Sequence, residues 1–124
     1  MASRKRRNKE STPSRVAIYS RKSKFTEKGD SIANQIAECR SKVLEKYPNI
    51  SEDNILIYED EGYSGATTNR PQFQQMLKDA KAKQFGALFC YRLDRVSRSV
   101  SDFSRLFEEL QRLKIRFVSV HDNF

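Results

Sequence analysis

The chain has few of the residues on which disulfide, zinc and histidine chemistry depend. It contains two cysteines and one histidine among 124 residues. Cys39 and Cys90 lie in apolar patterns without a C-x-x-C or metal-ligand spacing. We therefore expect reduced core cysteines in a cytoplasmic protein, with no disulfide and no bound metal. His121 is the single histidine, so the usual Ser-His-Asp triad is not expected either.

Long apolar runs and glycine-rich nucleotide motifs are also missing. No stretch approaches the ~20 apolar residues of a membrane span. The N-terminus lacks the apolar segment of a secretory signal. There is no G-x-G-x-x-G and no G-K-[ST], which leaves dinucleotide and P-loop hypotheses without support. We expect no membrane partner and no cofactor.

What the chain has in excess is positive charge. Its formal net charge is +8 and its pI is about 9.7, which favours a polyanionic partner, most often nucleic acid. Residues 1–15 carry six Lys and Arg against one Glu, whereas the remainder carries eighteen against fifteen. We interpret residues 1–14 as a basic, disordered tail and residues 15–124 as one domain.

Apolar periodicity predicts strands that alternate with helices. Strands are predicted over 15–20, 54–59, 86–91 and 115–120, and helices over 31–47, over 71–84 and from 99 onward. This order predicts an α/β fold with three layers, α/β/α, and a mostly parallel central sheet. Sites in such sheets lie beyond the carboxyl ends of the strands.

Three polar segments follow predicted strands at this edge. They are "RKSKFTEKGD", "EDEGYSGATTNR" and "RLDRVSRS". In the third, Arg95 and Arg98 precede a predicted helix N-terminus, where free N–H groups and the helix dipole favour an anion. Arginine suits bidentate phosphate binding, so this segment either binds a phosphate or forms a surface ion-pair network at the helix start.

The first segment offers a nucleophile. Ser20 and Ser23 flank Arg21 and Lys22. A serine hydroxyl beside fixed positive charge can attack phosphorus when that charge stabilises the developing oxyanions. The residue types alone do not choose between the two serines.

Taken together, the motifs resemble those of a known family. The stretches "YSRKS", "SIANQ", "YEDEGYSG", "NRPQF" and "YRLDRVSRS", in this order, resemble the catalytic domain of the serine recombinases over about residues 15–124. The specific part of this resemblance is the combination of two motifs. They are R-x-S after the first predicted strand and L-D-R-x-x-R after the third. "EDEGYSG" and "NRPQF" look more like the large integrases and transposon recombinases than the small resolvases. The resemblance implies a resolvase-like fold and site-specific recombination of DNA.

The resemblance also implies residue roles. Ser23 would attack a DNA phosphodiester, giving a 5′-phosphoserine link and a free 3′-hydroxyl. The arginines that would bind the scissile phosphate are Arg21, Arg70, Arg95 and Arg98. The resemblance further implies that Asp60 and Asp94 orient the arginines. Gln35 matches the polar residue that faces the site from the first helix, and Tyr19 matches the aromatic residue before R-x-S. It implies neither a metal nor a cofactor, and it leaves the general acid and base unassigned.

Family members continue into a long interface helix and DNA-binding parts. We therefore expect residues 1–124 to be an excised catalytic domain, a monomer or weak dimer that cannot recombine DNA alone. Dimers and tetramers would belong to the full-length protein, which would carry out strand exchange and religation.

Two other function classes stay open. A metal-dependent nuclease could use "EDE" at 59–61 to bind Mg²⁺, although no second acidic cluster completes a two-metal site. A non-catalytic domain could bind nucleic acid only through its basic tail and arginines. EDTA would inactivate a metal-dependent nuclease. Deletion of residues 1–14 would remove nearly all DNA affinity from a non-catalytic binding domain.

Overall fold

The computed structural model describes residues 13–22, 32–61, 71–92 and 100–121. Within these ranges the predicted alternation of strands and helices is confirmed. The strands are β1 (Val16–Lys22), β2 (Ile55–Glu61), β3 (Ala87–Cys90) and β4 (Arg116–Ser119). The helices are α1 (Ile32–Lys46), α2 (Pro71–Lys81) and α3 (Val100–Arg112), with a short 3₁₀ turn, η2 (Glu52–Asn54), before β2.

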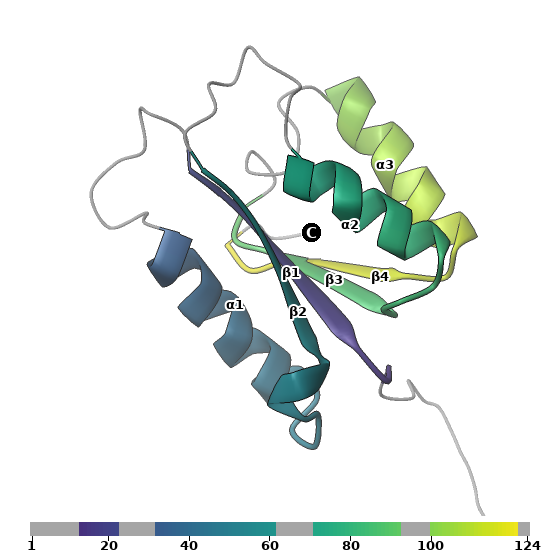
Figure 1. Cartoon of the computed structure of the whole chain (residues 1–124). Coiled ribbons are helices and arrows are strands. Elements are labelled where there is room, and N and C mark those ends of the chain that lie inside the picture. Colours follow the sequence, from purple (N-terminus) through teal and green to yellow (C-terminus); the bar gives the residue numbers. More distant parts are fainter. Residues whose placement is uncertain (1–12, 23–31, 62–70, 93–99, 122–124) are drawn as a thin grey trace, which may run out of the picture.

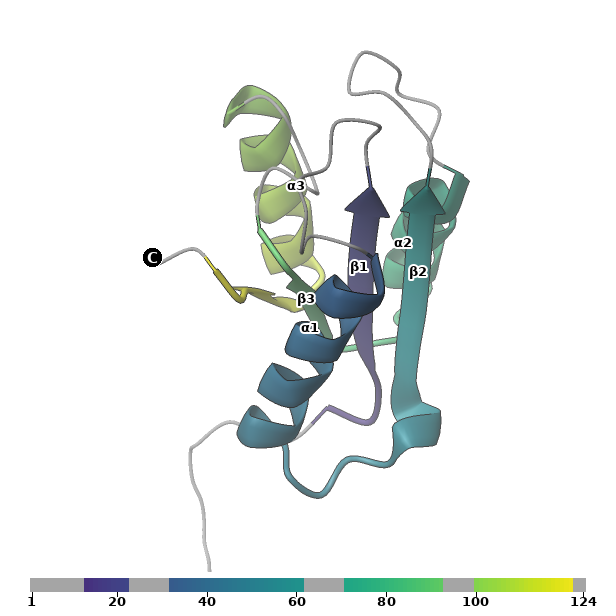
Figure 2. The same ribbon diagram turned by 90° about the vertical axis from the view of Figure 1, so that its left-hand side faces the viewer.

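The strands form a parallel sheet in the order β2-β1-β3-β4. Helix α1 covers one face of this sheet, and α2 and α3 cover the other (Figures 1 and 2). The predicted three-layer α/β/α architecture is thereby confirmed. Because β1 lies between β2 and β3, the carboxyl ends of these three strands are neighbours. None of the described helices is long and apolar enough to cross a membrane.

Two apolar clusters hold the layers together, one on each face of the sheet. On β1, Ala17 and Tyr19 point into the cluster shared with α2 and α3, whereas Val16 and Ile18 pack with α1. Strand β1 is therefore buried on both faces, as expected for the interior of a parallel sheet. Cys39 lies in the α1 cluster, and burial raises the pKa of its thiol to about 12. Both cysteines are free and buried, as the sequence predicted.

Strands β1 and β2 run further than the sequence predicted. Their pairing continues through Arg21 opposite Asp60 to Lys22 opposite Glu61. These residues were expected in the polar segments that follow the strands predicted over 15–20 and 54–59. The structure instead places Arg21 and Asp60 in paired, ordered strand.

Helices α2 and α3 end in the same way, with a lysine in the left-handed conformation. Lys83 has φ 59° and Lys114 has φ 62°. After α2, the Gln84 N–H bonds to the Asp79 carbonyl and the Lys83 N–H to the Ala80 carbonyl, which is the Schellman pattern. This turn ends α2 at Lys81, three residues before the predicted end.

Replacing these two lysines by glycine should stabilise the fold. An L-residue in the left-handed region costs roughly 1 kcal/mol, and glycine avoids that cost at some loss of chain entropy. We expect Lys83→Gly and Lys114→Gly each to raise the free energy of unfolding by about 0.5 kcal/mol, measured by urea denaturation. Lys78→Gly, inside α2, is the matched control and should cost about 1 kcal/mol. Destabilisation by all three variants would contradict this account of the helix ends.

Candidate active site at the carboxyl ends of the strands

Four of the nine predicted site residues lie in the described part of the chain. They are Tyr19, Arg21, Gln35 and Asp60, and all four lie in or contact the carboxyl ends of β1 and β2. The other five lie outside the described residues: Ser23, Arg70, Asp94, Arg95 and Arg98.

The Asp60 carboxylate accepts three hydrogen bonds at this edge. Its Oδ1 accepts the Gln72 N–H at 3.0 Å, and its Oδ2 accepts the Phe73 N–H at 3.0 Å. The Tyr19 hydroxyl donates to the same Oδ2 at 2.8 Å. The residue is only 1% exposed, so these three donors replace the water that a buried carboxylate would otherwise need.

The two N–H donors come from the first turn of α2. Pro71 opens the helix and has no N–H, so Gln72 and Phe73 carry the first free donors. Asp60 thus caps a helix that begins eleven residues later in the chain. A negative charge is also favourable at this positive end of the helix dipole.

This cap joins three elements at one point. Asp60 lies on β2, Tyr19 on β1, and the capped amides on α2. The end of β2 and the start of α2 are therefore held together at a single carboxylate. Arg70, a predicted phosphate ligand, is the residue that directly precedes Pro71 in the sequence.

Helix α2 is fixed to β2 at its other end as well. The Tyr58 hydroxyl donates to the Asp79 carboxylate at 2.6 Å. Burial, together with this hydrogen bond, raises the pKa of Tyr58, so its hydroxyl stays a donor near neutral pH. Two contacts along its length therefore prevent α2 from sliding against the sheet. The Tyr19 ring packs edge-on against Phe73, with centroids 5.3 Å apart.

A second set of hydrogen bonds holds β1 from the opposite face. Gln35 of α1 accepts the Ser20 hydroxyl at 2.9 Å through Oε1. Its Nε2 donates to the Arg21 carbonyl at 3.3 Å. The oxygen and the nitrogen of the Gln35 side-chain amide thus hydrogen-bond to two successive residues of β1. Ser20 is 0% exposed, so its hydroxyl is closed off from any substrate.

Gln35 and Asp60 contact β1 from its two faces, and Gln35 reaches Arg21 through the backbone. The predicted meeting of the β1, β2 and β3 ends is confirmed by the strand order. The convergence of Arg95 and Arg98 on this place stays a prediction, since both lie outside the described residues.

Arg21 is the cation at the end of this braced strand. It is 5% exposed and lies opposite Asp60 in the β1–β2 register. Strand alternation puts Arg21 on the same face as Tyr19, toward α2 and α3. A buried guanidinium is costly unless its donors and its charge have partners.

The structure gives the "EDE" metal hypothesis no support. Asp60 would have to release three hydrogen bonds to become a ligand, and Glu59 lies on the other face of β2. Within the described ranges, no group of three His, Cys, Asp or Glu side chains is arranged to hold a metal ion.

His121 makes contacts that are structural, at the end of β4. Its Nε2 lies 2.8 Å from the Glu38 Oε1 of α1, and its ring packs against Tyr91 at 4.4 Å. These contacts join the end of β4 to α1.

Sequence reasoning missed the role of Ser20. The available signal was strand alternation, because Ser20 follows Val16 and Ile18 at a spacing of two on a buried face. A polar residue in that position needs a partner, and Gln35 supplies it.

Comparisons with known proteins identify the family. The family model of the Resolvase, N terminal domain matches residues 16–124. The chain therefore belongs to this family, and its fold is that of a serine recombinase catalytic domain.

A protein of Bacillus subtilis (strain 168) named "Putative DNA recombinase" is 32% identical over 111 residues, which is 88% of this chain and 21% of that protein. The transposon Tn917 resolvase of Enterococcus faecalis is 33% identical over 63 residues, covering 51% of this chain and 33% of the resolvase. The chain thus spans between a fifth and a third of these two relatives.

Among solved structures, the N-terminal catalytic domain of TP901-1 integrase matches with a TM-score of 0.71 and 36% identity, over 86% of this chain and 77% of that one. The C-terminal catalytic domain of ISC1926 TnpA, an IS607-like serine recombinase, matches with a TM-score of 0.70 over 88% of this chain and 71% of that one. At 21% identity, this second match supports the fold alone.

Loss of the Asp60 charge should destabilise the protein. In Asp60→Asn, the amide can turn only one oxygen toward three donors, and its NH₂ group would face an N–H. We expect the free energy of unfolding to fall by about 1–3 kcal/mol in urea titrations. Glu59→Gln, one residue away and exposed, should change it by less than about 0.5 kcal/mol. Equal effects of the two substitutions would show that the Asp60 cap does not stabilise the fold more than an exposed carboxylate does.

Proposed function

We propose that the chain is the catalytic domain of a DNA recombinase that cuts and rejoins phosphodiesters through Ser23. The Ser23 oxygen attacks phosphorus, the bond from phosphorus to the 3′-oxygen breaks, and the serine proton is lost as the 3′-oxygen gains one. The products are a 5′-phosphoserine link and a free 3′-hydroxyl. Attack by another strand's 3′-hydroxyl reverses the step and releases Ser23. One ester replaces another, so the chemistry needs no nucleotide hydrolysis.

Family membership over residues 16–124 supports this proposal. The single observation that carries it furthest is the bracing of β1 directly before the R-x-S motif. Gln35 and Ser20 hold one face of the strand, and Tyr19 and Asp60 hold the other. Ser23 follows two residues after Arg21 in the sequence. A nucleophile attached to a fixed strand end loses little freedom on reaching its target, which favours reaction.

The arginines would bind and activate the scissile phosphate. Guanidinium groups can donate two parallel hydrogen bonds to phosphate oxygens and stabilise the charge that grows in the transition state. We assign this role to Arg21, Arg70, Arg95 and Arg98, with Asp94 orienting them. Three further residues have a positioning role: Tyr19, Gln35 and Asp60. They hold the backbone that carries Arg21 and the helix that follows Arg70.

The proposed partners are DNA and further copies of the protein, in the cytoplasm. Recombination requires paired cuts in two duplexes, so the full-length protein would assemble as dimers and tetramers. Residues 1–124 by themselves should be a monomer or weak dimer that binds DNA with little sequence preference and does not recombine it. A domain that merely binds nucleic acid would lose nearly all affinity on deletion of residues 1–14 and would form no covalent link.

The two serines of "YSRKS" should behave differently when replaced. In the intact gene product, Ser23→Ala should bind DNA yet form no covalent adduct in a denaturing gel assay. Ser20→Ala is the matched control. It leaves Gln35 short of one donor, so we expect a stability loss of about 1–2 kcal/mol with adduct formation retained. Adducts formed by Ser23→Ala, or lost only in Ser20→Ala, would overturn the nucleophile assignment.

Chelation separates this mechanism from a metal-dependent nuclease. Arginines supply the positive charge in the proposed step, so EDTA should leave the adduct yield within about twofold of its value in Mg²⁺. Divalent ions alter DNA binding through screening, and matched ionic strength controls for this effect. A loss of adducts in EDTA that added Mg²⁺ restores would favour the metal mechanism instead.

A further inference from the structure

The edge of the sheet opposite the candidate active site is strongly basic. At this edge lie the start of β1, the turn from α2 to β3 and the turn from α3 to β4, which gather on the right of Figure 1. Six exposed cations belong to these segments: Arg15, Lys81, Lys83, Arg112, Lys114 and Arg116.

Backbone hydrogen bonds place Arg15 and Arg116 on either side of Gly86. The Gly86 N–H donates to the Arg15 carbonyl at 2.9 Å, and the Arg116 N–H donates to the Gly86 carbonyl at 3.1 Å. Neighbouring strands lie about 4.8 Å apart, so the backbones of Arg15 and Arg116 are about 10 Å apart. Lys83 and Lys114 occupy equivalent left-handed positions in the two turns beside them.

The same edge is where the folded domain meets the basic N-terminal segment. A Cβ atom added to Gly86 would lie 2.8 Å from the Pro13 Cβ, so only glycine lets Pro13 pack so closely on the start of β3. This contact fixes residue 13 among the cations. Residues 1–12, which directly precede it, contain five Lys and Arg and one Glu.

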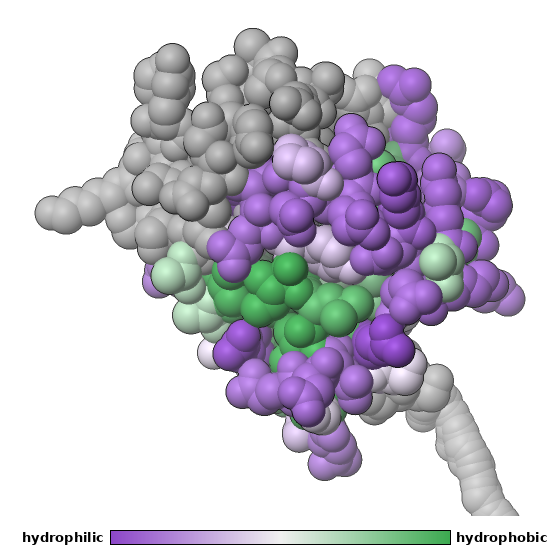
Figure 3. Space-filling model, in the orientation of Figure 1, coloured by the Kyte–Doolittle hydropathy of each residue, from purple (hydrophilic) through white to green (hydrophobic). Residues whose placement is uncertain are grey.

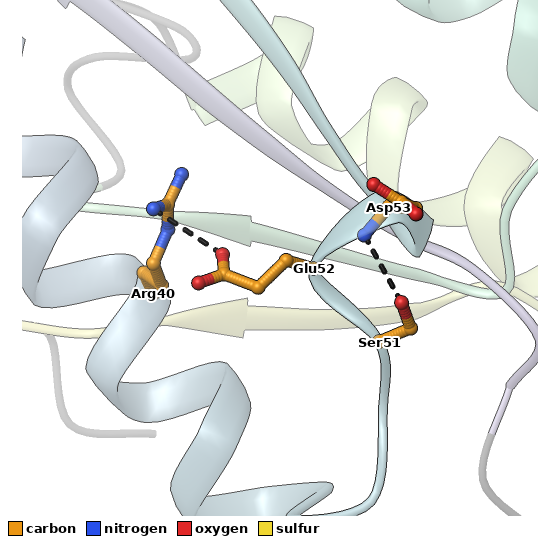
Figure 4. Close-up of polar contacts among 4 residues, drawn as sticks. All are labelled: Arg40, Ser51, Glu52 and Asp53. Carbon is orange, nitrogen blue, oxygen red and sulfur yellow. Dashed lines mark hydrogen bonds and ion pairs between the residues drawn. The ribbon is translucent and has the colours of Figure 1, made fainter.

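Acidic residues also lie near this edge. Glu109 forms an ion pair with Arg112, which neutralises one of the six cations. On the far side of β1, Glu52 of η2 is engaged by Arg40 of α1 at 3.3 Å (Figure 4). Asp53 is the exposed acid beside it, and it limits the basic surface to the starts of β1, β3 and β4.

We propose that this strand-start edge is a second DNA-contacting surface, which binds the phosphate backbone without reading sequence. The candidate active site lies at the other ends of the same strands, so the two surfaces are separate. Duplex DNA carries one charge per ~1.7 Å of its axis, and a row of cations about 10 Å wide meets several phosphates at once. This proposal rests on the proposed function in one respect, which is the choice of DNA as the polyanion that the surface binds.

The proposal is tested by the salt dependence of DNA binding. The chain of 124 residues is titrated with a fluorescent 25-base-pair duplex of arbitrary sequence over a range of NaCl concentrations. The edge variant is Lys83→Gln with Lys114→Gln, which keeps a long side chain at each left-handed position. The control variant is Lys42→Gln with Arg105→Gln, which removes the same total charge from the middle of α1 and from α3.

Each lost phosphate contact lowers the slope of log affinity against log salt by about 0.9. We therefore expect the edge variant to lose up to about 1.8 in slope and roughly tenfold in affinity, while the control changes affinity less than about twofold. Equal effects of the two variants would overturn the proposal, as would unchanged DNA binding with loss of binding to phosphatidylserine vesicles. Equilibrium binding needs no covalent step. A failed Ser23 assignment would therefore leave the salt-dependence result valid, and a failed salt-dependence test would leave the Ser23 assignment valid.

Discussion

The arrangement of the candidate site depends on one buried carboxylate. Asp60 joins the end of β2 to the Tyr19 hydroxyl of β1 and to the first amides of α2. Without it, the first N–H groups of α2 would lose their acceptor, and the end of β2 would lose its link to the start of α2. The carboxylate is tolerated in the interior because three donors and a helix N-terminus surround it.

Strand β1 is braced on both faces, and this bracing links fold to function. Gln35 bonds to Ser20 and to the Arg21 carbonyl on the α1 side, while Tyr19 and Asp60 act on the other side. The strand cannot tilt toward either layer without breaking one of these sets. Arg21, the first residue of the R-x-S motif, lies in its carboxyl end, and its amino end lies in the basic strand-start edge. One strand thus connects the two surfaces that we propose to bind DNA phosphates.

Much of this fold could be predicted from the sequence, because the helices and strands carry clear apolar periods and alternate along the chain. The sequence could not show that β1 and β2 continue through Arg21 and Asp60, since charged residues are typical of loops and their burial depends on partners distant in the chain. Asp60 caps a helix that starts eleven residues later, and Ser20 bonds to a glutamine fifteen residues away. Such contacts follow from packing and not from local pattern. The left-handed Lys83 and Lys114 escaped prediction because glycine is the usual signal for that conformation.

The central claim is that the residue just beyond the braced strand forms the covalent bond to DNA. Mass spectrometry of the trapped adduct tests it most directly. Proteolysis after Glu10 and Glu27 releases residues 11–27, a single peptide that contains both Ser20 and Ser23. After nuclease digestion of the DNA, fragmentation of this peptide should place the remaining 5′-nucleotide on Ser23. A nucleotide on Ser20, or on a residue outside this peptide, would contradict the account.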